Sequence, residues 1–302
     1  MSRRNIGDLC APERKFKPSK WSKAPGNAGF QFETKRQTKT EDAKRAKLLV
    51  KASRLYPALI HGERATELAA RLTYQSRDDV PDSLASATYY RKCRNVIAGH
   101  LWQFVSGCQE HPIATATIIP ESWEVSGEDL DRVDPSNFLA SFRSTLNRCG
   151  AQNASGFLFA CLHGEYEPNA NVFRPHIHAL VGGEMVGVLD RLRKRKGFRT
   201  QRLPHGAETD PVFQRVWITR EPLTNLPAPI TYLMQSFWPA RAIYTAEGRP
   251  TRQTRKRRIP EPYHSTYLLW ADRWKIDDIS LLMGLRVTKS GIKPSRKNRT
   301  RT

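Results

Sequence analysis

The segment 173–181 constrains the chain most, because it places one histidine on each side of an aliphatic residue and continues into an apolar run. In an extended strand, successive side chains alternate between the two faces, so His176 and His178 would share one face and Ile177 would point to the other. Two imidazoles on one face of a rigid strand can each give a nitrogen to a metal ion. His-x-His pairs without a metal role are the commoner case, so the rest of the chain must decide.

The charge of the chain indicates a polyanionic partner. Lysine and arginine number 50 against 29 acidic residues among 302, which gives a formal charge of +21. Nucleic acid is the default partner for such an excess. No uninterrupted apolar stretch has the roughly 18 residues of a membrane span, so no membrane contact is predicted.

The amino terminus and the cysteines predict a cytoplasmic protein. Met1 to Arg4 lead into no apolar segment of the kind that a secretion signal contains. The five cysteines are scattered and form no Cys-x-x-Cys pair, which argues against a zinc finger and against a disulfide framework. A reducing compartment is the simplest setting for such a chain.

Composition and periodicity divide the chain into four parts. Residues 1–40 are basic and poor in apolar residues, which predicts a flexible arm. Helical periodicity over 41–55, 63–74 and 83–105 predicts a helical region spanning 41–109. Residues 110–245 mix strands and helices. Residues 246–302 are basic again and contain one helical stretch, 265–285, that could bind DNA.

The third part predicts an α+β fold with a central antiparallel sheet and flanking helices. Residues 113–119 alternate and are rich in β-branched side chains, as is typical of a strand. A helix is expected from Asp134 and Pro135 to Cys149. A strand over 156–167, a turn at 168–171 and the His-x-His strand follow. A further strand is expected over 212–219 and a helix over 229–244.

The strand before the histidines offers a third metal ligand. His163, Glu165 and Glu167 have the same parity and share a face. If the two strands pair as an antiparallel hairpin, that face lies beside His176 and His178. Two imidazoles and one carboxylate, Glu165 or alternatively Glu167, would leave coordination positions open for substrate, and this mixed donor set suits Mg²⁺ or Mn²⁺, with Zn²⁺ possible. Solvent-facing glutamates are the alternative.

The helix expected from Pro229 supplies a candidate nucleophile, Tyr232. A tyrosine hydroxyl is a poor nucleophile unless a metal or a base assists it. If it attacks a phosphodiester, it forms a phosphotyrosine ester that conserves the bond energy for later rejoining. Tyr244, twelve residues further along, is the alternative nucleophile, and an ordinary helix residue is the alternative role for Tyr232.

Taken together, these segments resemble the HUH endonuclease superfamily, and within it the rolling-circle replication initiators of plasmids and single-stranded phages. The first motif of the family, an apolar strand with threonines, is similar to residues 113–119, which include Thr115 and Thr117. The second motif is similar to residues 174–181, including the proline before the first histidine. The third, Tyr-x-x-Lys on a helix, is met only in part, because Gln235 stands where the family has lysine. The resemblance covers residues 110–245.

The resemblance implies a metal-dependent nickase with a sheet like that of RNA-recognition domains. Tyr232 would become joined to the 5′ phosphate and free a 3′ hydroxyl for a polymerase, with Gln235 one helical turn away. The expected partners are single- and double-stranded DNA at a replication origin and a host helicase and polymerase, and a bacterial plasmid or phage would encode the protein. The residues expected to contact DNA are Thr115, Thr117, Arg174, Arg241, Arg255, Lys256, Arg257 and Arg258.

Two alternatives stay open. A relaxase or a transposase of the same superfamily would use the same chemistry. A non-enzymatic DNA- or RNA-binding regulator, whose histidines are structural, would share the charge but would form no covalent adduct with DNA.

Overall fold

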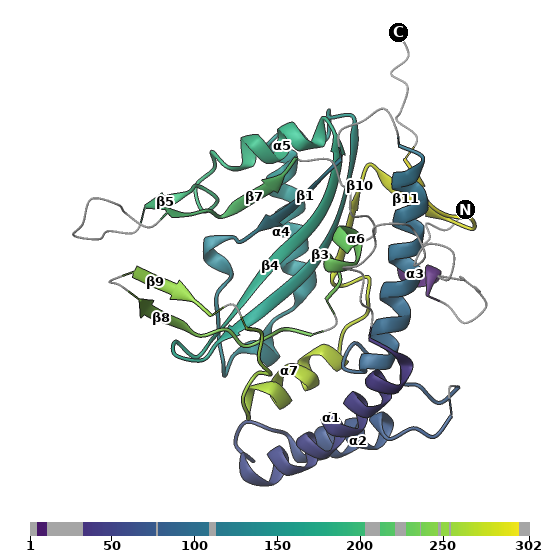
Figure 1. Ribbon diagram of the computed structural model, residues 1–302, viewed down its shortest axis with the longest axis vertical. Coiled ribbons are helices and arrows are strands. Elements are labelled where there is room, and N and C mark those ends of the chain that lie inside the picture. Colours follow the sequence, from purple (N-terminus) through teal and green to yellow (C-terminus); the bar gives the residue numbers. More distant parts are fainter. Residues whose placement is uncertain are drawn as a thin grey trace.

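The centre of the fold is a six-stranded antiparallel sheet flanked by helices (Figure 1). This computed structural model describes residues 5–10, 33–76, 78–108, 113–202, 212–220, 228–235, 237–246, 249–253 and 255–295. Five strands run in the order β10-β3-β4-β1-β7, and β2 also pairs with β4. Their bounds are β1 Ile113–Ile118, β2 Val125–Ser126, β3 Gly156–Glu167, β4 Val172–Gly183, β7 Val216–Thr219 and β10 Ser280–Met283. The predicted α+β class is confirmed.

Three two-stranded hairpins lie outside this sheet. They pair β5 with β6, β8 with β9 and β11 with β12. Their bounds are β5 Gln201–Arg202, β6 Val212–Phe213, β8 Ile243–Ala246, β9 Arg249–Arg252, β11 Leu285–Thr288 and β12 Gly291–Pro294.

The hairpin β3–β4 sets the register of the sheet. A four-residue turn, 168–171, joins the strands, and its last residue, Asn171, adopts a positive φ of 53°. Asparagine tolerates this left-handed conformation better than most residues. The turn makes Glu167 face Val172, and every later pair follows from that one.

The two faces of the sheet differ in their cover. Along β1, residues alternate between half-buried and buried, and the buried set, Ala114, Ala116 and Ile118, faces away from the histidines. Figure 1 shows α4 (Pro135–Arg148) behind the sheet, while α5 (Met185–Leu192) follows β4 directly. Asp134 caps α4 by accepting a hydrogen bond from the Ser136 amide, and Pro135 occupies the first turn, as the sequence predicted.

The predicted helical region is present as α1 (Lys35–Leu55), α2 (Gly62–Leu72) and α3 (Ala87–Ser106). α1 begins inside the predicted flexible arm, because Thr34 and Gln37 form a capping box at its start. Residues 5–10 contain the short 3-10 helix η1 (Gly7–Leu9), and its Leu9 is fully buried. The prediction of a flexible arm is therefore wrong for these two described stretches, since their few apolar and capping residues find partners in the fold.

The C-terminal part belongs to the core of the fold. The helix predicted over 265–285 is α7 (Tyr263–Asp272), which ends much earlier. Residues 280–283 instead form β10, which pairs antiparallel with Leu158 to Cys161 of β3. The prediction of a continuous helix over 265–285 is therefore wrong, and DNA binding by this region stays a prediction. The sheet domain also continues past its predicted end at residue 245, because the edge of β3 is covered by β10.

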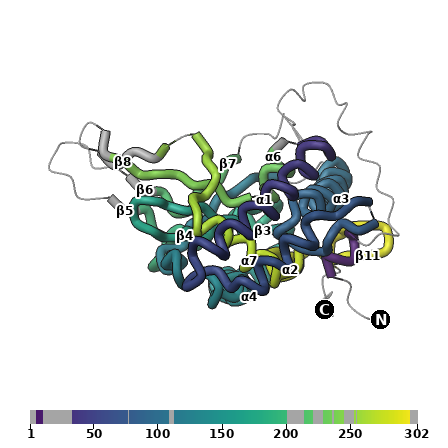
Figure 2. The backbone as a smooth tube through the Cα atoms, turned by 90° about the horizontal axis from the view of Figure 1, so that it is seen from below, coloured from purple at the N-terminus to yellow at the C-terminus, as the bar shows by residue number. Residues whose placement is uncertain are grey.

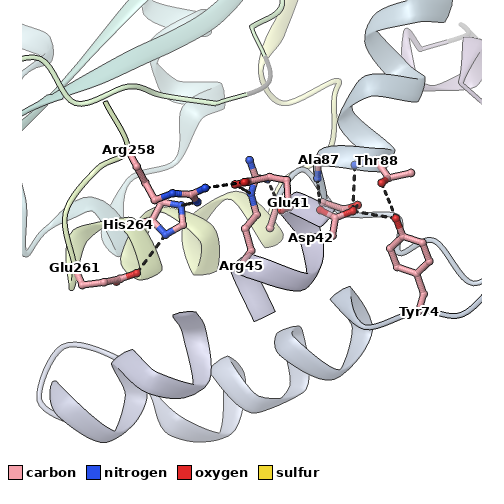
Figure 3. Close-up of polar contacts among 11 residues, drawn as sticks. Glu41, Asp42, Arg45, Tyr74, Ala87, Thr88, Arg258, Glu261 and His264 are labelled. Carbon is pink, nitrogen blue, oxygen red and sulfur yellow. Dashed lines mark hydrogen bonds and ion pairs between the residues drawn. The ribbon is translucent and has the colours of Figure 1, made fainter. Parts of the chain in front are cut away.

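Buried polar contacts join the helical region to α7. Seen from below, α1, α2 and α7 lie side by side (Figure 2). Asp42 of α1 accepts hydrogen bonds from the first amides of α3, those of Ala87 and Thr88, at 2.6 and 3.2 Å (Figure 3). Glu41 binds Arg258 at 2.6 Å and Arg45 at 3.1 Å, and Arg258 also contacts His264 of α7. Among the described residues, no helix is both long and apolar enough to cross a membrane.

Candidate active site

Three histidines meet on one face of the sheet. The register places His163 of β3 directly opposite His176 of β4, and His178 opposite Cys161 on one side and Thr117 of β1 on the other. All three imidazoles are buried, and one ligand atom from each lies within 4.8 Å of the other two. These three side chains could hold a metal ion.

The hydrogen bonds of two of the rings support this assignment. Nε2 of His163 lies 3.2 Å from the carbonyl oxygen of Phe237, and Nδ1 of His176 lies 3.0 Å from that of Arg174. Since a carbonyl only accepts, each of these nitrogens carries the single N–H of a neutral ring. The remaining nitrogens, Nδ1 of His163 and Nε2 of His176, then face each other at 3.2 Å with lone pairs only.

Two facing lone pairs repel unless a cation lies between them. Metal–nitrogen bonds of roughly 2.1 Å separate neighbouring ligand atoms by roughly 3.0 to 3.4 Å. The 3.2 Å between His163 and His176 falls in this range. Metal-bound histidines also usually donate their other N–H to a carbonyl or carboxylate, as both rings do here. The residues present therefore fit a divalent metal ion.

The histidines are held in the neutral form that binds metal. Burial lowers the pKa of His176 to about 4. Burial also lowers the pKa of His163 and His178 well below the ordinary value. Repulsion between the protonated forms of these rings and of His176 lowers both pKa values further. Lys256 pushes all three pKa values in the same direction, which places its positive charge near the cluster.

The predicted carboxylate ligand lies outside the cluster. Glu165 is buried on the same face, two residue pairs closer to the hairpin turn, and its carboxylate is 3.9 Å from the guanidinium of Arg241. The alternative, Glu167, lies next to the turn, where it accepts a hydrogen bond from the Asn169 amide. In the structure His163 takes the place expected for a glutamate.

Tyr232 lies directly against the histidines. It ends α6 (Ala228–Tyr232), and its ring meets that of His178 edge to face, with 4.9 Å between the centroids. The side chain is 48% exposed, so a substrate can reach it. The helix predicted over 229–244 is wrong in length: it ends at Tyr232 and the chain continues in a turn and an extended segment.

Lys256 supplies a cation next to this tyrosine. Its Nζ donates to Oε1 of Gln235 at 2.6 Å and lies 5.3 Å from the centre of the Tyr232 ring. The lysine that the family motif would place at position 235 is thus replaced by glutamine, and Lys256 brings a positive charge to the same place from a segment 21 residues away. Arg241, which the sequence predicts to contact DNA, instead lies 3.9 Å from the Glu165 carboxylate.

The segment after Gln235 lies along the part of the β3 edge that β10 does not cover. Trp238 packs on Gly164, where an added Cβ would lie 2.5 Å from the indole ring. The Tyr166 amide donates to the carbonyl of Pro239, and the Arg241 amide donates to the carbonyl of Tyr166, both at 2.9 Å. This segment, 237–241, is called the strap below. It places the Phe237 carbonyl against His163.

The other predicted residues near the histidines have defined places. Oγ1 of Thr117 lies 3.1 Å from Nδ1 of His178, and Thr115 is half-buried on the same face of β1. Arg174 pairs with Glu124 at 3.1 Å. Thr117 thus orients a histidine in this structure, a role that the resemblance did not specify.

The remaining predicted residues lie further out. Tyr244 is 50% exposed on β8, whose residue Ile243 accepts a hydrogen bond from Asn169 at the hairpin turn. At about 3.3 Å per residue, the end of β3 at this turn is roughly 13 Å beyond His163, which favours Tyr232 as the nucleophile. Arg255 and Arg257 are exposed, whereas Arg258 is bound to Glu41 and His264.

The roles of two site residues were missed, for different reasons. His163 shares the parity of Glu165, and a four-residue turn at 168–171 would by itself have placed it opposite His176. Lys256 was expected among the residues that contact DNA, but its place beside Tyr232 carries no local signal, because that place depends on how the chain returns through β8 and β9. Comparisons with protein-family models, curated proteins and solved structures gave no significant match.

Proposed function

We propose that the protein is a metal-dependent endonuclease of the HUH type, which nicks and rejoins single-stranded DNA through Tyr232 and starts rolling-circle replication. The observation that supports this most is the contact of an exposed tyrosine with a cluster of three buried, neutral histidines. Such a pairing of metal ligands and a tyrosine on one sheet face is what the motif order in the sequence predicted.

The side chains have separate parts in the proposed reaction. The Oη of Tyr232 attacks the phosphorus, the bond from phosphorus to the 3′ oxygen breaks, and the proton of the tyrosine ends on the released 3′ hydroxyl. One diester replaces another, so the reverse reaction rejoins the strand. Lys256 faces the same space and would neutralise charge on the attacked phosphate. Thr117 keeps His178 in one orientation.

A divalent ion bound by His163, His176 and His178 would polarise the phosphate for attack. Nitrogen donors favour a transition-metal ion over Mg²⁺, so Mn²⁺ fits the cluster better of the two predicted metals.

The test is the formation of a denaturation-resistant protein–DNA adduct. The full chain is mixed with Mn²⁺ and a pool of single-stranded oligonucleotides, and the trapped adduct is mapped by peptide mass spectrometry. We expect the DNA on Tyr232. Tyr232→Phe should abolish the adduct, since only the attacking hydroxyl is lost. His163→Ala should abolish both the adduct and Mn²⁺ binding, while Glu165→Gln should retain metal binding.

The outcomes separate the rival roles. A non-enzymatic nucleic-acid-binding protein would bind the pool and form no adduct with any metal. An adduct on Tyr244 would refute the role of Tyr232. A relaxase or a transposase would give the same adduct and would differ in the DNA that it selects.

A further inference from the structure

We propose that Trp217 is a stacking platform for one unpaired base of single-stranded DNA, on the open part of the sheet face that carries the histidines. The choice of DNA as occupant rests on the proposed function, while the surface itself follows from the geometry below.

The register aligns Trp217 with the histidine cluster. Thr117 of β1 pairs with His178 on one side and with Trp217 of β7 on the other. Residues directly opposite in neighbouring strands project to the same face, so His178, Thr117 and Trp217 form one row. With strands about 4.8 Å apart, the backbone of Trp217 lies roughly 10 Å from that of His178.

Among the described residues, this row runs from a covered to a more exposed part of the face. On the β3 side, Phe104 of α3 packs edge to face on Phe157, with 4.8 Å between the centroids, and α6 contacts α3. On the β1 side, Thr115 and Thr117 are only half-buried, and Trp217 is 58% exposed. Figure 1 shows α6 against β3, with β1 and β7 lying beyond it.

The position of the indole matters more than its exposure. Single exposed apolar side chains are ordinary on protein surfaces. Among the described residues, however, the large apolar side chains that are exposed form two sets. One set, Leu55, Tyr56 and Leu59, lies where α1 ends and α2 approaches. The other is wholly aromatic and comprises Trp217, Tyr232, Phe237 and Tyr244; Tyr232 contacts His178, and Trp217 lies in the same row of the sheet.

Aromatic platforms beside cations are the features by which proteins bind single-stranded nucleic acid. Each base has two π faces, and stacking on an aromatic ring is tolerant of sequence. The chain carries a charge of +21, and Lys256 stands beside Tyr232. If the attacked phosphate lies at Tyr232, the strand can continue across Thr117 to Trp217, where a neighbouring base would stack.

The test measures single-strand binding apart from cleavage. All variants carry Tyr232→Phe, and their affinity for a fluorescein-labelled oligothymidylate is measured by anisotropy at moderate salt without added metal. Trp217→Ala should weaken binding roughly 5- to 150-fold. Trp217→Phe should restore most of the affinity, because the ring is retained. Tyr56→Ala is the matched control, because it also removes an exposed aromatic ring, but at the end of α1 and away from the histidine row. It should leave the affinity unchanged.

A second measurement guards against misfolding of the alanine variant. Ultraviolet crosslinking of the Trp217-containing protein to an oligonucleotide with 5-iododeoxyuridine should give a crosslinked peptide that contains Trp217. Unchanged affinity in Trp217→Ala, or crosslinks only elsewhere, would overturn the proposal. That result would leave the adduct assay untouched, so the inference can fail while the proposed nuclease function stands.

Discussion

Lys256 stands beside Gln235, at the place where the HUH motif carries its lysine. The two side chains are hydrogen-bonded at 2.6 Å, and the ammonium group lies over the Tyr232 ring. If the chemistry needs a positive charge here, the side chain that delivers it should be interchangeable between the two positions. This gives a test that a merely structural lysine would not pass.

We predict that Lys256→Gln lowers the rate of adduct formation roughly 10- to 100-fold, because one charge that stabilises the attacked phosphate is lost. The double variant Gln235→Lys, Lys256→Gln exchanges the two side chains and should recover most of the rate. Single-turnover kinetics with Mn²⁺ would measure both. If Lys256→Gln reacts like the wild type, or if the exchange restores nothing, the charge has no such role.

At the residue scale, side-chain parity predicted more of the site than motif matching did. His176 and His178 follow from a period of two, and so does the shared face of His163 and Glu165. Whether His163 or Glu165 is the third metal ligand depends on the register of the two strands, and the turn sets that register. The sequence favoured the glutamate because two imidazoles and one carboxylate suit Mg²⁺ or Mn²⁺, whereas the four-residue turn brings an imidazole to the cluster.

The strap 237–241 shows how one element controls the geometry of another. It replaces the second half of a helix predicted over 229–244. The apolar residues Ile230, Leu233 and Met234 at the start of this segment are buried, whereas Phe237 is exposed. The chain nevertheless turns extended, because Trp238 packs on Gly164 and Pro239 and Arg241 bond to β3. Tertiary contacts of this kind leave no periodic signal in sequence.

Gly164→Ala should therefore act on the metal site from the opposite face of the sheet. The new Cβ would lie 2.5 Å from the Trp238 ring, which must move and carry the Phe237 carbonyl away from His163. We expect a loss of about 1 to 3 kcal/mol in the free energy of unfolding, together with weaker Mn²⁺ binding. Urea denaturation and isothermal titration calorimetry would measure the two effects.

Gly62→Ala is the matched control for this substitution. Nothing lies within 4 Å of an added Cβ at Gly62, which begins α2. Its metal affinity should match that of the wild type, and its free energy of unfolding should be unchanged or higher by up to about 1 kcal/mol, because alanine restricts the unfolded chain. Gly164→Ala with unaltered metal affinity would show that the strap does not position His163.

For the whole molecule, contacts between segments far apart in the chain were the hardest feature to predict. Composition correctly separated a helical region from a strand-containing one. It could not show that residues 280–283 complete the sheet or that residues 5–10 pack into the core, because both pairings join residues far apart in the chain. Charge density also misled at the C-terminal end: Arg258 lies in a basic run, yet it pairs with Glu41 of α1.

Glu41 makes the free energy of unfolding depend on pH. Burial alone would raise the pKa of its carboxyl, but the hydrogen bonds and charges of Arg258 and Arg45 outweigh burial and lower that pKa below the ordinary value (Figure 3). A carboxyl with a lowered pKa in the folded state binds its proton more weakly there than in the unfolded chain. Its contribution to stability is thus complete above the unfolded pKa, near 4.5, and is lost as the pH falls through the folded one.

We therefore predict that Glu41→Gln lowers the free energy of unfolding by about 1 to 3 kcal/mol at pH 7, because charged hydrogen bonds between α1 and the segment before α7 are weakened. The difference between wild type and variant should stay constant from neutral pH down to about pH 5 and shrink below it, since the wild-type carboxyl then becomes protonated. Urea denaturation at a series of pH values measures this difference, in which the titration of groups far from Glu41 cancels.

The exposed Glu63 of α2 provides the control, and Glu63→Gln should show almost no difference at any pH. A Glu41→Gln difference that grows as the pH falls would mean that the carboxylate, caught between two arginines, does not stabilise the fold.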